Sequence, residues 1–230
     1  MFVYAFSLYK WPKSIIKEVQ ALIKNIVWTG SNHERKIITV VWKDFINLVD
    51  MGGLSIKYLG IFNEALLTKF TWNILTSNDS SLEFLSNRFT SKLQNGYSIY
   101  FPSSIWIDIQ YSYKDLMRCS KWLVCRESSL NLWHTPWLSK PINEVITAPT
   151  HMKQIYIHDA MLDDTLQASL SPNILLELKY VFVDFDLLRW TPDHVGHFSA
   201  KGFYRNKCED GTAVPMWLKN FRQHFISPVK

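Results

Sequence analysis

Adjacent and near-adjacent carboxylates are the residues of this chain that could support phosphoryl transfer. In a two-metal site of the polymerase-palm type, this chemistry needs paired aspartates on a hairpin and a third carboxylate to hold the metal ions. Asp163-Asp164 is the only adjacent aspartate pair, and it lacks flanking aromatic residues and strand patterning, so we interpret it as a solvated loop or helix start. Asp184 and Asp186 would share one face of a strand, but we expect a surface or capping role for them. We therefore expect no catalytic carboxylate set.

Cysteine and histidine spacing bears on metal binding, because zinc sites use clustered ligands such as C-x2-C. Cys119 and Cys125 are six residues apart on different expected elements. His194, His197 and Cys208 could in principle hold a metal, but we expect no metal or cofactor site. The sequence also shows no Gly-rich phosphate loop and no nucleophile elbow, so we expect a chain without enzymatic activity.

The strongest binding signal is a lysine stripe on an expected helix over residues 12–28. At 100° per residue, Lys13, Lys17 and Lys24 fall on one side, opposite a broad apolar side. Such a stripe suits a nucleic-acid backbone, and the alternative is the solvated face of a helix that packs on a core. Trp11 and Trp28 bracket the stripe. They could stack on single-stranded bases or anchor a core, and both interpretations stay open.

Charge and composition narrow the class of protein. The net charge is +5, and an acidic stretch over residues 141–200 lies between basic ends. Basic ends suit phosphates, although many cytosolic proteins are mildly basic. Three cysteines argue against a secreted disulfide framework, and no apolar run approaches the ~20 residues of a membrane span. We expect a nuclear or cytoplasmic protein that is neither secreted nor membrane-bound; the sequence leaves its oligomeric state open.

Hydrophobic periodicity predicts a mainly helical chain with one short antiparallel β-ribbon near residues 122–134, an α+β class. The ribbon would pair strands 122–124 and 130–133. Trp72, Trp106 and Trp122 lie on apolar faces and are expected in the core. The remaining expectations are a strand at 36–42, a strand or irregular segment at 181–190, a turn at 51–54, and helices at 12–28, 42–49, 58–76, 80–93, 104–117, 173–180, 201–208 and 215–225.

Four sequence blocks together resemble the C-terminal part of plant LINE-type (non-LTR) retrotransposon reverse-transcriptase proteins. Such proteins are often named as ribonuclease H or reverse-transcriptase zinc-binding proteins. The match spans almost the whole chain, and its specificity comes from the order of the blocks. The blocks are residues 8–12 running into 26–30; 35–36, 41–43, 52–56, 59–60 and 63–65; 104–106 leading to 122, 133 and 137–138; and 188, 190–193 and 196–201, ending in 204–205.

The resemblance implies a thumb-like helical region that follows a polymerase palm, then a Trp-rich spacer. Residues 217–230 resemble the entry to a zinc-binding module whose metal ligands would lie beyond Lys230. One departure is clear: the family commonly has Gly-Asn-Gly after the first spacer tryptophan, and this chain has Cys125-Arg126-Glu127. Without glycines that tolerate left-handed angles, we expect this turn to be rebuilt or frayed.

These observations predict two parts: a thumb-like helical region with the Trp-rich spacer over 1–140, and over 141–230 more spacer continuing into the truncated start of a zinc-binding-type domain. The expected function is a non-catalytic fragment of a LINE-type RNA-directed DNA polymerase polyprotein. Lys13, Lys17, Lys24, Trp11 and Trp28 would contact the RNA or DNA backbone with low specificity. The alternatives are a free-standing nucleic-acid-binding remnant and a pseudogene fragment without selected function.

Overall fold

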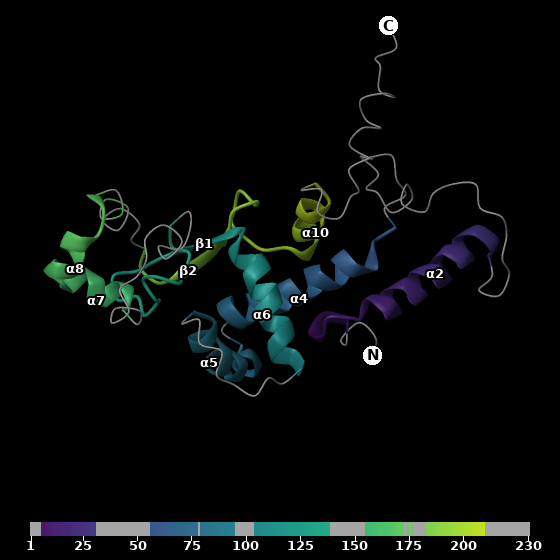
Figure 1. The fold of residues 1–230 in the computed structure, drawn as a ribbon, viewed down its shortest axis with the longest axis horizontal. Coiled ribbons are helices and arrows are strands. Elements are labelled where there is room, and N and C mark those ends of the chain that lie inside the picture. The colour runs from purple at the N-terminus through teal and green to yellow at the C-terminus, as the bar shows by residue number, and fades with distance from the viewer. Residues whose placement is uncertain are drawn as a thin grey trace, which may run out of the picture. The chain divides into compact units, whose positions relative to one another are not determined.

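The computed structural model describes residues 6–30, 56–77, 79–94, 104–138, 155–172, 174, 176 and 183–209. Within these residues the chain is mainly helical with one two-stranded antiparallel sheet, which confirms the expected fold class (Figure 1). The helices are α2 (Lys13–Thr29), α4 (Leu59–Thr76), α5 (Ser80–Gln94), α6 (Ser104–Met117), α7 (Ile157–Leu162), α8 (Asp164–Ser169) and α10 (Ala200–Glu209), and the strands are β1 (Ser120–Leu123) and β2 (Leu187–Trp190).

The chain forms two compact units. The first unit comprises Met1–Leu67 and Ser199–Lys230, and the second comprises Thr68–Phe198. Residues 139–154, around the predicted division at residue 140, lie outside the described residues, so this division stays a prediction. Also outside them are the expected strand at 36–42, the turn at 51–54, the helices at 42–49 and 215–225, and most of the helix at 173–180.

Helix α2 confirms the element expected at 12–28. Pro12 precedes it with φ −57°, and its carbonyl accepts the first helical hydrogen bond from Ile16 at 3.1 Å. Gly30 ends it in the left-handed conformation, φ 72°, and donates to the Ile26 carbonyl at 2.9 Å. The expected core packing of its apolar side is limited: only Ile16 is buried, while Leu22 and Ile26 are about half exposed.

Helices α4, α5, α6 and α10 follow their expected positions closely. In the second unit, Ile74 of α4, Phe89 of α5, and Trp106 and Ile109 of α6 form one buried cluster. The Phe89 and Trp106 rings stack with centroids 4.9 Å apart. Trp72, Trp106 and Trp122 are buried as predicted. The large aromatic content thus serves packing at these positions, where each ring removes much apolar surface from water.

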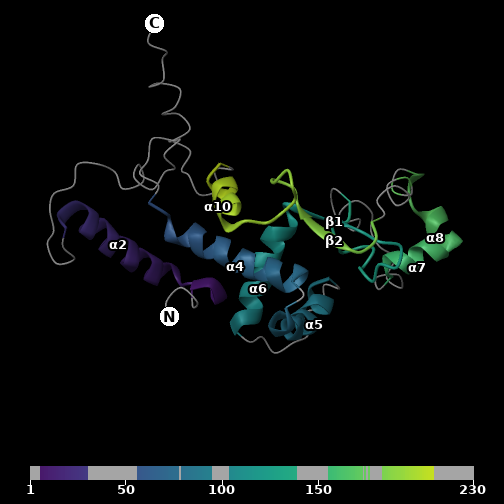
Figure 2. The same ribbon diagram turned by 180° about the vertical axis from the view of Figure 1, so that it is seen from behind.

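The sheet corrects the predicted β-ribbon. Strand β1 overlaps the expected strand 122–124, but it pairs antiparallel with β2, so that Ser120 faces Trp190 and Leu123 faces Leu187. Figure 2 shows the two strands side by side. The partner expected at 130–133 forms no strand, because the Asn131 side-chain oxygen accepts the Trp133 and His134 N–H groups. An Asx turn of this kind takes the donors that a ladder would need.

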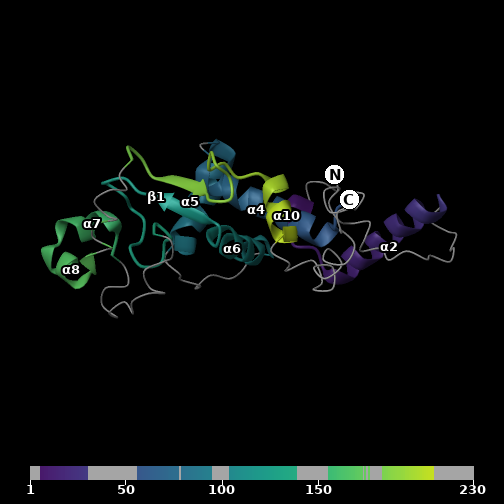
Figure 3. The same ribbon diagram turned by 90° about the horizontal axis from the view of Figure 1, so that it is seen from above.

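Residues 157–169 form two short helices that periodicity did not predict. Helices α7 and α8 follow one another directly in the second unit (Figure 3). Leu130 accepts the Ile157 N–H at 3.0 Å, and Asn131 bridges to Tyr156. The segment after β1 therefore pairs with the start of α7. In the described part of the chain, no helix is long and apolar enough to cross a membrane.

Candidate nucleic-acid interface

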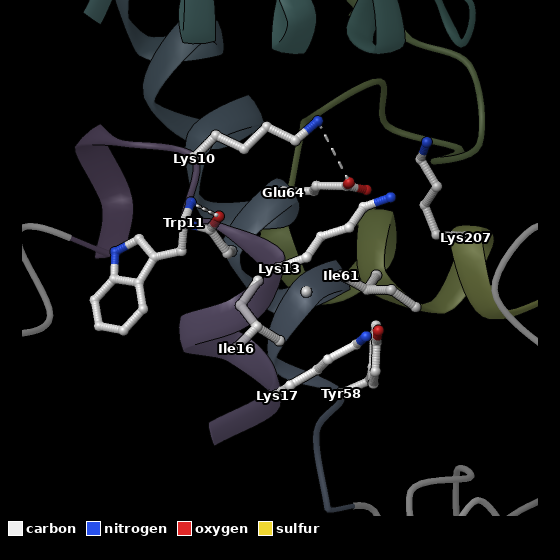
Figure 4. A pocket seen from close by; sticks show the side chains of 11 residues that line it. Lys10, Trp11, Lys13, Ile16, Lys17, Tyr58, Ile61, Glu64 and Lys207 are labelled. Carbon is white, nitrogen blue, oxygen red and sulfur yellow. Dashed lines mark hydrogen bonds and ion pairs between the residues drawn. The ribbon is translucent and has the colours of Figure 1, made fainter. Parts of the chain in front are cut away.

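A lysine-lined pocket of about 530 Å3 lies in the first unit, where the start of α2, the start of α4 and the end of α10 meet. We call it the lysine pocket. Its charged lining consists of four lysines and one glutamate: Lys10, Lys13, Lys17, Lys207 and Glu64. Figure 4 shows how these side chains lie around the pocket. The uncharged lining residues are Trp11, Ile16, Tyr58, Gly60, Ile61 and Asn63.

Asn63 fixes the chain that leads into α2. This side chain is 1% exposed, and its Oδ1 accepts the Trp11 N–H at 2.9 Å. Its Nδ2 donates to the Phe6 carbonyl at 2.6 Å and the Tyr9 carbonyl at 2.9 Å. One buried amide thus satisfies three backbone groups that would otherwise lack partners in the described structure. The position of Lys10 and the start of α2 follow from this anchor.

The charges of the pocket are unevenly paired. Lys10 Nζ lies 3.9 Å from Glu64 Oε1, and both side chains are more than a third exposed, so this ion pair contributes little to stability. Lys13 and Lys17 are exposed, and neither forms an ion pair with a described residue. Because these two lysines are four residues apart on one helix, their side chains project from neighbouring positions. The pocket can therefore attract an anion.

Tyr204 of α10 holds the far wall of the pocket. Its hydroxyl accepts the Tyr58 backbone N–H at 2.8 Å, across 146 residues of sequence. Burial raises the pKa of Tyr204 to about 12, against a smaller lowering by the Tyr58 N–H. The phenol therefore stays neutral and keeps its place as acceptor at physiological pH. This bond ties α10, which carries Lys207, to the start of α4.

The structure brings together part of the predicted site. Lys13, Lys17 and Trp11 all line the lysine pocket, whereas Lys24 and Trp28 lie further along α2 and do not. The Trp11 ring packs edge-on against Phe6, with centroids 4.5 Å apart. In Figure 4 this ring points away from the lysines.

Of the lining residues that sequence reasoning did not assign to a site, three bear most on binding: Lys10, Tyr58 and Lys207. Lys10 precedes Trp11 directly and could have been added to the stripe. Tyr58 opens the expected helix at 58–76, but no local pattern marks it as a site residue. Lys207 lies 190 residues after Lys17, and no periodicity links them.

Two of the carboxylates considered for phosphoryl transfer accept hydrogen bonds from the chain itself. Asp163 Oδ1 accepts the Thr165 N–H at 2.9 Å and its hydroxyl at 2.5 Å, at the start of α8, which confirms the helix-start interpretation. Asp186 is half-buried and makes long-range contacts: it accepts the Cys125 N–H at 2.8 Å and the Ser128 hydroxyl at 2.9 Å, so it links the start of β2 to the turn after β1.

The Asp186 carboxylate also explains the turn that lacks glycines. Ser128 donates its N–H to the Cys125 carbonyl at 3.3 Å, which closes the turn 125–128. The same carboxylate holds both ends of this turn. The turn therefore forms without glycines, which agrees with the expectation of a rebuilt turn and not with that of a frayed one. Among the described residues, no three His, Cys, Asp or Glu side chains are grouped so that they could hold a metal ion.

Comparison with known proteins relates the chain to plant sequences. It is 23% identical over 240 residues to an Arabidopsis thaliana protein named "putative ribonuclease H protein", covering 93% of this chain and 38% of that protein. It is 34% identical over 74 residues to an Arabidopsis thaliana "uncharacterized mitochondrial protein", covering 32% of this chain and 48% of that protein. No protein-family model and no solved structure matches the chain.

These similarities relate the chain, at low identity, to two plant proteins, one of which is named as a ribonuclease H protein. The chain spans less than half the length of either relative.

Proposed function

We propose that this chain is the thumb and spacer segment of a LINE-type RNA-directed DNA polymerase polyprotein, and that its lysine pocket binds the phosphate backbone of the template–primer. The observation that carries the proposal is the meeting of four lysines around one pocket, three from residues 10–17 and one, Lys207, from α10. Similarity to a ribonuclease-H-named plant protein over 93% of the chain adds support from an independent source.

The charge density of the ligand fits the pocket. Duplex nucleic acid carries one negative charge per roughly 1.7 Å of helix axis, so lysines about 6 Å apart on one helix face can each meet a phosphate. Binding of this kind releases counterions and carries no sequence information. Lys10, Lys13 and Lys17 are all exposed, and Glu64 partly offsets the charge of Lys10.

We further propose that the segment itself catalyses nothing. The best carboxylate candidates support this, because Asp163 and Asp186 each accept two hydrogen bonds from the chain's own donors. A primer-extension assay with Mg²⁺ or Mn²⁺ tests the proposal. We expect no nucleotide incorporation by the purified chain, and incorporation above a no-protein control would overturn this part.

A binding assay tests the interface. Fluorescence anisotropy with a labelled RNA–DNA duplex at low salt should show saturable binding by the chain. The double variant Lys13→Ala/Lys17→Ala should lose most of this affinity. The matched control is Lys69→Ala/Lys201→Ala, which removes the same charge from exposed helix positions outside the pocket. Equal loss in both variants would reduce the interaction to net charge and contradict the proposed interface.

A further inference from the structure

The wall of the lysine pocket carries an exposed aromatic ring. Tyr58 lines the pocket and is 38% exposed, which is high for a tyrosine whose backbone is anchored on both sides. Its N–H is held by Tyr204, and its carbonyl accepts the Phe62 N–H at 3.0 Å. Lys17 lines the same pocket (Figure 4). An exposed aromatic ring and a cation therefore both border this pocket.

Gly60 leaves the space that this ring occupies. A Cβ atom at position 60 would lie 2.8 Å from Tyr58 Cε1, closer than real side-chain contacts, so any other residue would displace the ring. Glycine at a helical position is less stable than alanine by about 1 kcal/mol. Gly60 lies in the first turn of α4 and has ordinary negative φ, so backbone geometry does not require it. The absence of a side chain at Gly60 leaves space for the Tyr58 ring.

We propose that the lysine pocket binds a single-stranded segment of nucleic acid, with one base stacked on Tyr58 and the adjoining phosphates on Lys13, Lys17 and Lys207. This inference rests on the proposed backbone-binding function and adds the form of ligand and the residue that selects it. Aromatic side chains stack on every base, so such a site is tolerant of sequence. In a duplex the bases are stacked on one another and their faces are closed to Tyr58. A duplex can engage the lysines alone.

Anisotropy titrations with a labelled single-stranded oligonucleotide and with its duplex, at one salt concentration, test the inference. Tyr58→Ala should weaken single-strand binding about tenfold and leave duplex affinity within about twofold. Tyr58→Phe keeps the ring and should bind like the unmodified chain. Gly60→Ala should weaken single-strand binding through displacement of the ring. Tyr111→Ala is the matched control, because Tyr111 is an exposed tyrosine of α6 outside the pocket.

The outcomes separate the two proposals. If Lys13→Ala/Lys17→Ala weakens binding but Tyr58→Ala matches Tyr111→Ala, base stacking is wrong and backbone binding stands. If Tyr58→Ala weakens single-strand and duplex binding equally, the ring does not select the single strand and the inference is overturned. If the unmodified chain binds neither oligonucleotide, both proposals fail. Circular dichroism of each variant shows whether the helices are retained.

Discussion

Substitution of Asn63 by alanine should loosen the entry to α2 and with it the lysine pocket. The change removes one acceptor and two donor hydrogens from a side chain that is 1% exposed. It leaves the Trp11 N–H and the Phe6 and Tyr9 carbonyls without their partner. The three hydrogen bonds are all to backbone groups, which cannot rotate toward new partners as a side chain can.

The loss in the free energy of unfolding depends on how exposed these three backbone groups are. A buried polar group without a partner costs about 1–3 kcal/mol, and water reduces this where it can reach the group. Tyr9 is exposed, so its carbonyl can be hydrated, whereas Trp11 and Phe6 are half-buried. Counting about 1 kcal/mol for each of those two, with a smaller contribution from Tyr9, gives about 2–3 kcal/mol in the free energy of unfolding of the first unit.

Hydrogen exchange measures this local effect directly. In the unmodified chain the Trp11 amide should exchange slowly, and Asn63→Ala should speed its exchange roughly 30- to 150-fold, since each 1.4 kcal/mol is a factor of ten. The control is Asn73→Ala, an asparagine at a half-buried position of the same helix. Equal hydrogen-exchange rates of the peptide 6–16 in Asn63→Ala and Asn73→Ala would refute the anchoring role of Asn63.

Three further predictions concern other parts of the chain. Gly196→Ala should lower the melting temperature by several degrees, because position 196 has φ 85° and an added Cβ would lie 2.5 Å from Arg189 Nε; a melting curve unchanged from that of the parent chain would contradict this. Asp186→Ala should destabilise the second unit by about 1–3 kcal/mol in urea unfolding through loss of the Cys125 and Ser128 contacts, and Asp184→Ala, the control, should not. Tyr204 should lose its proton near pH 12 instead of at its ordinary 10. The measurement is the tyrosinate absorbance titration of the parent chain minus that of Tyr204→Phe. Because the pKa is raised in the folded state, the contribution of this group to stability is present below pH 10 and is lost as the pH rises toward 12. A difference titration centred at pH 10 would show that this phenol is not buried.

Helix positions could be predicted from the sequence because their signals are local. Pro12 and Gly30 bracket α2, and the Ser199 hydroxyl accepts the Gly202 N–H at 3.0 Å at the start of α10. Apolar spacing placed α4, α5 and α6 within a residue or two of their observed bounds. Each of these signals acts over one or two helical turns, which is the range that periodicity covers.

Strand pairing could not be predicted in the same way, because the partner of β1 lies more than sixty residues away. The nearer candidate at 130–133 has strand-like composition, but Asn131 uses its side chain to hold a turn there. Local composition therefore favoured the wrong partner. Strand β2 alternates between exposed and buried residues, but its sequence does not identify β1 as its pairing partner.

Only part of the candidate site could be predicted, because its residues come from segments that are distant in sequence. Lys13 and Lys17 come from one helix face, and the stripe identified both. Lys207 and Tyr58 join them through the Tyr204 hydroxyl and the Asn63 amide, two contacts that span 146 and more than 50 residues. Lys24, part of the same stripe, lies beyond the reach of those contacts and outside the pocket.

The salt dependence of duplex binding tests the central claim most directly. Each lysine that neutralises a phosphate contributes about 0.9 to the slope of log affinity against log salt concentration. The account predicts that Lys13→Ala/Lys17→Ala reduces this slope by about two, while Lys69→Ala/Lys201→Ala leaves it unchanged. A slope that is the same in the parent chain and in the Lys13/Lys17 variant would show that these lysines meet no phosphate, and would contradict the account.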